Sequence, residues 1–187
     1  MQKILIRSIY FLFIIYFSVS RGFCSLPENS IYNLKSNFIN KENKSINIVE
    51  LEGKIQIFSM IYTNCKTICP IIISNMKSIE RLIPSDIIDH VNFTLITLDP
   101  ERDTPITLKK FFNEKKFTNR WNLFRTTKEE TLKLALMLGI KYKKDKNSEY
   151  THSNLIIILD KNGEIKLHHQ GLDKNYTPLI ELLAKLK

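Results

Sequence analysis

With 187 residues, 43% of them hydrophobic and only 5 of them glycine, the chain has the composition of one compact globular domain rather than a repeat array or a low-complexity chain. Its formal net charge of +9 comes from 28 Lys and Arg against 19 Asp and Glu, with the lysines scattered over the whole length. Nucleic-acid binders usually gather their cations in one stripe, so we expect no nucleic-acid partner. We interpret the charge as a solvated surface, or as attraction toward anionic lipid or an acidic protein.

Residues 1–20 have the features of a targeting segment. Lys3 and Arg7 precede an uncharged apolar run that ends in the small residues Ser18 and Ser20. This run is shorter than the roughly 20 apolar residues that cross a bilayer, so we expect a signal peptide cleaved after Ser20, with a retained N-terminal membrane anchor as the alternative. Both interpretations predict export of the rest of the chain.

A polar stretch follows, and it contains the first of the three cysteines. Cys24 is not preceded by the small and aliphatic residues expected before a lipidated cysteine, so we interpret it as incidental rather than as a lipid anchor or a third metal ligand. Residues 21–37 are predicted to form a polar arm, and the folded domain is predicted over 38–187. Its first element is a hairpin with the turn at 41–44.

Apolar runs predict the strands of a sheet. Buried strands are expected over 55–62, 91–98 and 155–159, and shorter or half-buried ones over 121–124 and 165–169. An Asn162-Gly163 pair predicts a two-residue hairpin turn between the last two strands. Because the run over 55–62 is apolar on both faces, we expect it at the centre of the sheet, with helices on both sides.

Helices are predicted between these strands. Proline or threonine followed by apolar residues at helical spacing predicts helices that begin near Pro70, Thr104, Thr127 and Thr177. The side chains expected to face the core include Met76, Leu82, Trp121, Leu132 and Leu136. The alternation of strands and helices predicts an α/β fold, in which a mixed sheet is sandwiched between helices.

Two cysteines follow the predicted central strand directly. Cys65 and Cys69 lie at the carboxyl edge of the sheet, where open α/β folds keep their sites, and at the start of a helix, whose positive dipole end favours thiolates. Residues four apart can reach the same side of a helical turn. Two thiolates so close together repel, and either a shared cation or a disulfide relieves the repulsion.

His152 is the candidate third ligand. It precedes the apolar strand over 155–159 and follows a charged stretch over 143–149, so we expect it on a loop at the same edge of the sheet. Two sulfurs and one imidazole suit Cu(I), and zinc accepts the same three ligands with a water molecule. A surface histidine before a strand is more often an ordinary loop residue. The residues alone therefore leave the role of His152 open.

Three ordered motifs resemble those of the Sco/SenC family of cytochrome oxidase assembly proteins, and the resemblance covers about residues 38–187. They are Tyr62-Thr63-x-Cys65-x-x-x-Cys69-Pro70, Asp99-Pro100-Glu101-Arg102-Asp103-Thr104-Pro105, and His152-Ser153 before an apolar strand that ends Asp160-x-x-Gly163. Lys66 stands where the family commonly has proline after the first cysteine, and Thr151 where it commonly has aspartate before the histidine. Neither departure removes a ligand.

The resemblance implies a thioredoxin-like fold of the peroxiredoxin type and a copper chaperone rather than an enzyme. Cys65, Cys69 and His152 take the family's ligand positions for one copper ion, Cu(I) or Cu(II). The implied client is the dinuclear copper centre of cytochrome c oxidase subunit II, and another copper donor protein is the second expected partner. The expected location is the periplasmic side of a bacterial inner membrane, or the equivalent mitochondrial intermembrane space.

Two other functions use the same cysteines. In a thiol-disulfide oxidoreductase that keeps oxidase cysteines reduced, Cys65 and Cys69 would be the redox-active pair. Thioredoxins usually have two residues between the cysteines, whereas three separate them here. A purely structural disulfide is the weakest alternative, because so short a loop removes little chain entropy.

The remaining polar candidates have simple structural explanations. Asp99 is expected to end a strand and Asp103 to help cap the next helix, with a role near the copper or in partner contact as the alternative. His168 and His169 are adjacent on a strand and point to opposite faces, so they do not form a metal pair. His90 is expected on a loop.

Overall fold

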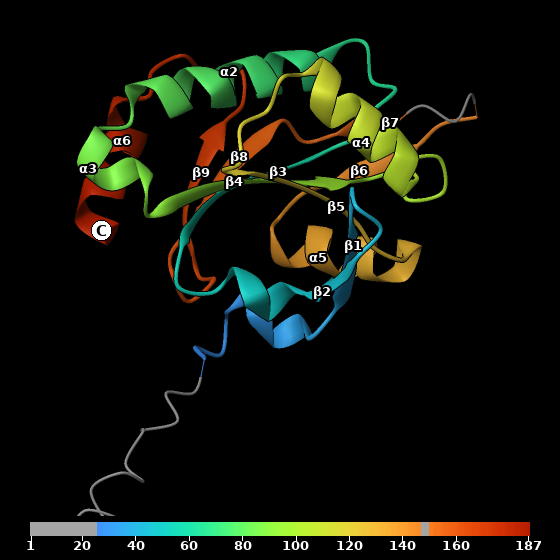
Figure 1. Cartoon of the computed structure of the whole chain (residues 1–187), viewed down its shortest axis with the longest axis horizontal. Coiled ribbons are helices and arrows are strands. Elements are labelled where there is room, and N and C mark those ends of the chain that lie inside the picture. The colour runs from blue at the N-terminus through green and yellow to red at the C-terminus, as the bar shows by residue number, and fades with distance from the viewer. Residues whose placement is uncertain (1–25, 147–149) are drawn as a thin grey trace, which may run out of the picture.

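A seven-stranded mixed sheet forms the centre of the protein (Figure 1). The computed structural model describes residues 26–146 and 150–187, so the predicted targeting segment and Cys24 lie outside the described residues. The strand order is β2-β1-β5-β4-β3-β8-β9. The strands are β1 Asn37–Asn40, β2 Ser45–Asn47, β3 Ile55–Ile61, β4 Val91–Thr97, β5 Trp121–Arg125, β8 Leu155–Leu159 and β9 Ile165–Gln170. Strands β3, β4 and β5 run parallel, whereas β1 and β8 run antiparallel to them, which confirms the predicted mixed sheet.

Helices cover both faces of the sheet, as the alternation of elements predicts (Figure 1). One face carries the helices α2 Ile68–Leu82, α3 Ser85–Ile88, α4 Pro105–Glu114 and α6 Thr177–Leu186. The other carries α5 Lys128–Met137 and the 3-10 turns η1 Ile31–Leu34 and η2 Ile48–Leu51. A separate two-stranded sheet consists of β6 Tyr142–Lys144 and β7 Tyr150–His152. Within the described ranges, none of these helices combines the length and the apolar character that a bilayer crossing requires.

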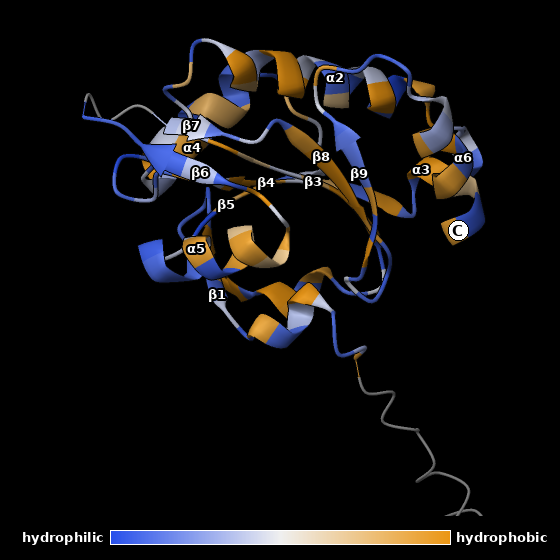
Figure 2. Cartoon of the chain, turned by 180° about the vertical axis from the view of Figure 1, so that it is seen from behind, coloured by the Kyte–Doolittle hydropathy of each residue, from blue (hydrophilic) through white to orange (hydrophobic). Residues whose placement is uncertain are grey.

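Strand β3 separates two apolar cores, because every one of its residues is buried. Ile57 faces the core under α2, α4 and α6, whereas Phe58 faces the core under α5 and the 3-10 turns. Met76 and Trp121 lie in the first of these cores, as predicted. Figure 2 shows apolar residues along β8 in the interior and hydrophilic residues along β6 at the edge. The central strand is therefore packed on both faces up to its end, where the loop that carries Cys65 begins.

Three leucines predicted to face the core are exposed instead. Leu136 is 71% exposed and Leu132 is 48% exposed, because α5 packs on the sheet through a narrow stripe centred on the fully buried Leu134. Leu82, the last residue of α2, is 55% exposed, and the next residue, Ile83, takes the inward position.

The packed part of the chain begins before the boundary predicted at residue 38. Ile31 and Tyr32 in η1 are both buried in the core under α5. The Tyr32 hydroxyl donates a hydrogen bond to the carbonyl oxygen of Leu51 at 3.1 Å. Apolar contacts thus hold the second half of the predicted polar arm against the domain, a feature that its polar composition concealed.

The turn between β8 and β9 is longer than the two-residue turn predicted from Asn162 and Gly163. A two-residue type I′ turn needs positive φ at both positions, and of these two only Gly163 has it, at +78°. The amide of Asp160 instead donates to the carbonyl oxygen of Glu164 at 3.0 Å, which closes a wider loop.

The helix starts predicted near Thr104, Thr127 and Thr177 are confirmed, but only the first two threonines are caps. The hydroxyls of Thr104 and Thr127 accept hydrogen bonds from the first turns of α4 and α5. Thr177 is the first residue of α6 rather than its cap, and Tyr176 occupies the cap position.

Candidate metal centre

Two cysteines flank the start of α2, at the carboxyl end of the central strand. Strand β3 ends at Ile61, and the chain then turns so that the amide of Cys65 donates to the carbonyl oxygen of Tyr62 at 3.2 Å. Helix α2 begins at Ile68, so Cys69 lies in its first turn. The amide of Cys69 donates a hydrogen bond to the sulfur of Cys65 at 3.4 Å. Both sulfurs therefore lie at the sheet edge and helix N-terminus where the sequence predicts them.

His152 reaches the same place from a different element. It is the last residue of β7, rather than a loop residue as expected, because its backbone pairs with Tyr142 of β6. Its Nε2 lies 3.4 Å from the sulfur of Cys69. Its Nδ1 lies 2.8 Å from the carbonyl oxygen of Ser153, which can only accept a hydrogen bond. The ring proton therefore belongs on Nδ1, and the lone pair of Nε2 faces the sulfurs.

The three side chains form one group with the spacing of metal ligands. The sulfurs of Cys65 and Cys69 and a ring nitrogen of His152 all lie within 4.8 Å of one another. Ligands bound at about 2.3 Å for sulfur and about 2.0 Å for nitrogen lie roughly 3.5–4 Å apart around one ion, so a small contraction would complete the site. Two soft sulfurs and an imidazole suit copper or zinc rather than magnesium or calcium.

The two thiols differ in acidity. Burial opposes ionisation of Cys65, but hydrogen bonds from Cys69 and Thr67 outweigh it and lower the pKa of Cys65 to about 7. Burial raises the pKa of Cys69, and the neighbouring Cys65 raises it further. Burial also lowers the pKa of His152, which favours the neutral imidazole that binds metals. At pH 7 about half of Cys65 is therefore thiolate, whereas Cys69 keeps its proton until a cation displaces it.

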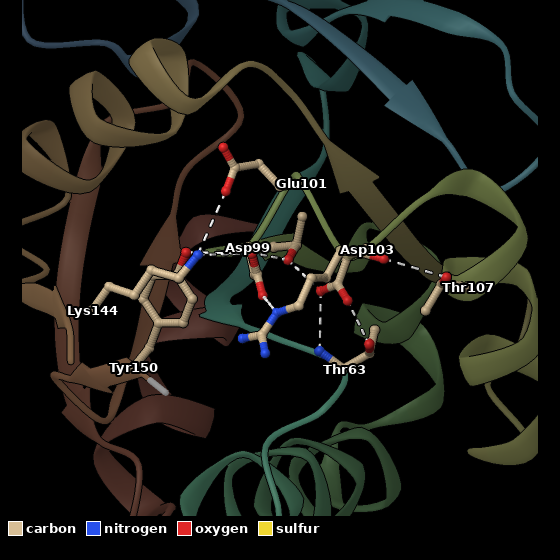
Figure 3. A network of polar contacts seen from close by, with 9 residues as sticks. Thr63, Asp99, Glu101, Asp103, Thr107, Lys144 and Tyr150 are labelled. Atoms are coloured by element: carbon tan, nitrogen blue, oxygen red, sulfur yellow. Dashed lines mark hydrogen bonds and ion pairs between the residues drawn. The ribbon is translucent and has the colours of Figure 1, made fainter. Parts of the chain in front are cut away.

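The acidic run that begins at Asp99 makes polar contacts with Thr63 and Tyr150, residues close in the chain to Cys65 and His152 respectively (Figure 3). Asp99 and Asp103 are both buried, and the hydroxyl of Thr104 caps α4 while the Asp103 carboxylate bonds to Thr63 and Thr97 instead of helping in the cap. Asp99 accepts a hydrogen bond from the Tyr150 hydroxyl at 3.3 Å. Because Tyr150 belongs to β7, the carboxylate contacts the strand that carries the candidate imidazole ligand.

Two aromatic residues near the site were not predicted to take part in it. The ring of Tyr62 lies 5.3 Å from that of Tyr150 and 6.3 Å from that of His152, measured between centroids. Tyr62 is the first residue of the cysteine motif, so the sequence did indicate that it lies near the site. Tyr150 has no comparable signal, because only the β6–β7 pairing brings it to the site.

The other histidines lie where the sequence predicts them. His90 is exposed in the loop before β4. His168 and His169 point to opposite faces of β9, and their Nε2 atoms lie 3.0 Å from the carbonyl oxygens of Leu138 and Asp173 respectively. Within the described ranges, the cysteines and His152 form the group with metal-ligand spacing.

The fold and this group of ligands define a thioredoxin-like domain with a candidate site for one soft metal ion. A sequence model described as SCO1/SenC matches residues 27–186, and the chain belongs to the SCO1/SenC family. This confirms the resemblance seen in its motifs. The SCO1 protein homolog of Bacillus subtilis is 25% identical to the chain over 154 residues, which cover 80% of this chain and 78% of that protein.

Solved structures share the fold. The SCO1/SenC family lipoprotein from Bacillus anthracis is 26% identical, with a TM-score of 0.73 over 80% of this chain and 91% of that one. Bradyrhizobium japonicum ScoI, solved with copper bound, is 22% identical, with a TM-score of 0.66 over 81% and 97%. BsSco is described as having a disulfide switch and as a member of the Sco family of cytochrome c oxidase assembly proteins. It is 23% identical, with a TM-score of 0.70 over 80% and 90%.

Proposed function

We propose that this chain is a copper chaperone, which binds one copper ion through Cys65, Cys69 and His152 and delivers it to the dinuclear copper centre of cytochrome c oxidase subunit II. The observation that carries the proposal is the convergence of two sulfurs and one imidazole nitrogen within 4.8 Å. The copper-bound ScoI structure supports the choice of copper, and the description of BsSco as an oxidase assembly protein supports the client.

The residues of the chain prepare the site for a copper ion. The hydrogen bond to Ser153 holds the His152 ring with Nε2 toward the sulfurs, as outer hydrogen bonds do at many metal centres. Cys65 is 7% exposed and Cys69 only 1%, so an arriving ion meets the thiolate of Cys65 first and then displaces the proton of Cys69. Three protein ligands leave a position open, through which a ligand of the client can join before those of the chaperone leave.

The proposed site of action is outside a membrane, on the periplasmic side of a bacterial inner membrane or in the mitochondrial intermembrane space. The basic and then apolar character of residues 1–20 supports export. A relative described as a lipoprotein supports a link to the membrane. In this setting an upstream donor protein loads the copper and subunit II of the oxidase receives it.

The test is a Cu(I) titration of the reduced protein, read out by X-ray absorption. The expected result is one copper per chain, bound by two sulfurs and one nitrogen. Cys65→Ser and Cys69→Ser should each remove tight binding, and cells that carry them should fail to assemble active oxidase under limiting copper. Retention of one tightly bound copper by a variant that carries both Cys65→Ser and Cys69→Ser would overturn the proposal, because the ligands would then lie elsewhere.

A thiol-disulfide oxidoreductase is the second candidate, and the unequal thiols favour it. A thiolate at Cys65 with a pKa of about 7 can attack a disulfide at neutral pH, and the buried Cys69 can then resolve the mixed disulfide. Oxidase cysteines kept reduced in this way would also support assembly. Reduction of a model disulfide by the copper-free protein tests this candidate.

A further inference from the structure

Asp103 is an ionisable residue in the interior of the protein, and it is not one of the three candidate metal ligands. Its side chain is 1% exposed. The cap of α4, the role its position suggested, belongs to the neighbouring Thr104, whose hydroxyl accepts the amide of Thr107. A buried carboxylate is costly unless hydrogen bonds stabilise it, so its partners indicate what it holds in place.

The carboxylate of Asp103 accepts three hydrogen bonds from two threonines, and Figure 3 shows it beside Thr63. The amide of Thr63 donates to Oδ2 at 3.0 Å, and the hydroxyl of Thr63 donates to Oδ1. The hydroxyl of Thr97 also donates to Oδ2. Thr63 lies in the loop that leads from β3 to Cys65, and Thr97 is the last residue of β4. The carboxylate thus ties the cysteine loop to the end of the neighbouring strand.

We propose that Asp103 is a positioning residue of the metal centre, which holds the cysteine loop in the conformation that binds the ion. It acts through Thr63, which stands two positions before Cys65. A loop that is already fixed in the bound geometry loses less conformational freedom when the ion arrives, so the affinity is higher. The inference rests on the proposed copper function, because it concerns the organisation of that same site.

If Asp103 only stabilised the fold, its loss would not affect copper binding specifically. Strand β4 offers a matched pair of residues that separates this structural role from a positioning role. Thr97 and Thr94 lie on the same strand, and both are fully buried. The hydroxyl of Thr97 donates to Asp103, whereas that of Thr94 donates to Gln56 at 2.8 Å. Each hydroxyl also accepts one hydrogen bond, that of Thr97 from the amide of Asp99 and that of Thr94 from the side-chain amide of Asn122. Valine at either position therefore removes two hydrogen bonds with little change in shape. Only the change at Thr97 disturbs the tie to the cysteine loop.

The experiment compares Asp103→Asn, Thr97→Val and Thr94→Val with the wild type. Cu(I) affinity is measured by competition with a chromophoric chelator, the site geometry by X-ray absorption, and the resistance to urea on the same samples. We expect Asp103→Asn to lower Cu(I) affinity about 10-fold or more, as loss of outer-shell partners does at other metal centres. Thr97→Val should lower the affinity as well. Thr94→Val should bind copper as the wild type does, with a loss of urea resistance similar to that of Thr97→Val.

The outcomes separate this inference from the proposed function. Wild-type affinity in both Asp103→Asn and Thr97→Val would overturn the inference alone, as would an equal loss of affinity in Thr94→Val and Thr97→Val. A wild-type protein that takes up no Cu(I) would overturn the proposed function and the inference together. If Asp103→Asn does not fold, Thr63→Val replaces it, because that change removes the hydroxyl bond and keeps the bond from the amide.

Discussion

The Nε2 of His152 lies 3.4 Å from the sulfur of Cys69, although 83 positions separate the two residues in the chain. The sulfur comes from the first turn of α2, and the ring comes from the small β6–β7 sheet. The candidate site therefore forms only when these two parts of the molecule are docked. A metal ion that takes the place of the thiol proton at this contact would join them directly.

Replacement of His152 separates copper carriage from thiol chemistry. We expect His152→Ala to lower Cu(I) affinity by at least about 100-fold, because loss of a ligand should exceed the 10- to 100-fold effects of outer-shell residues. Reduction of a model disulfide should continue, since exchange needs an attacking and a resolving cysteine but no imidazole. The two activities are measured on the same preparation.

His168→Ala is the matched control for this variant, because His168 lies on β9 and contacts the carbonyl oxygen of Leu138 instead of the cysteines. It should keep both activities. If His152→Ala loses copper yet supports oxidase assembly at the wild-type level under limiting copper, copper carriage is not the function, and the thiol reductase becomes the better explanation.

The unequal thiols predict a selective chemical modification of the copper-free protein. Cys65, whose pKa is lowered to about 7, should react with iodoacetamide at a rate that rises with pH through about 7. Cys69 should react far more slowly, because burial raises its pKa. Trypsin cuts after Lys66, so the two cysteines fall on different peptides and mass spectrometry can follow each one. Equal rates at pH 7 would contradict the assignment.

The central part of the fold could be predicted because its signals are local. Strand β3 is mainly apolar, with only Gln56 and Ser59 polar, and proline and threonine mark the helix starts near Pro70 and Thr104. The cysteines could be placed at the sheet edge for the same reason. Errors arose where packing decides the outcome, as for Leu136, which has helical spacing but lies off the narrow stripe that contacts the sheet.

Contacts within the site could be predicted only in part. The family motifs indicated His152 as a ligand, but its strand depends on pairing across residues that the apolar pattern does not mark. The tie from Asp103 to Thr63 spans 40 positions and joins two residues of different motifs. Each motif was visible in the sequence, but nothing in their spacing revealed that one holds the other in place.

Oxidation of the cysteine pair should abolish Cu(I) binding. A disulfide between Cys65 and Cys69 removes both thiolate ligands, and a single imidazole does not hold the ion. The measurement is Cu(I) uptake by the fully oxidised protein and again after reduction, which should restore it. Copper binding that survives complete oxidation would place the ligands elsewhere.

Two glycines provide a test of the packing at the far end of the sheet. Gly163 has φ of +78°, and a Cβ there would lie 2.7 Å from the Tyr32 ring, whereas Gly53 has φ of +85° with nothing within 4 Å. Gly53→Ala should therefore lower the free energy of unfolding by about 1–2 kcal/mol through backbone strain alone. Gly163→Ala should cost about 1–3 kcal/mol more through overpacking. Urea unfolding measures the free energy of unfolding of both variants. Equal losses would show that the Tyr32 ring moves aside without an energetic cost.

Exposed lysines beside the candidate site predict that transfer to the client depends on charge. Lys141 and Lys143 are exposed next to the strand that carries His152, and Lys143 pairs with Thr151. Cations around a binding site speed association with an acidic partner, and salt weakens the effect. We expect the double variant Lys141→Glu and Lys143→Glu to bind Cu(I) as the wild type does. It should transfer the ion to the soluble copper domain of oxidase subunit II about 10-fold more slowly at low salt.

The matched control for this charge reversal is Lys54→Glu, because Lys54 precedes β3 and so lies at the opposite edge of the sheet. It changes the net charge in the same direction but away from the site, and it should transfer copper at nearly the wild-type rate. Stopped-flow measurements over a range of ionic strengths should show the transfer rate of the wild type falling as salt increases, until it approaches that of the double variant at Lys141 and Lys143. Equal transfer rates for all three proteins at low salt would mean that electrostatic attraction does not guide the client to the site. The prediction that the client presents an acidic surface to Lys141 and Lys143 would then be wrong.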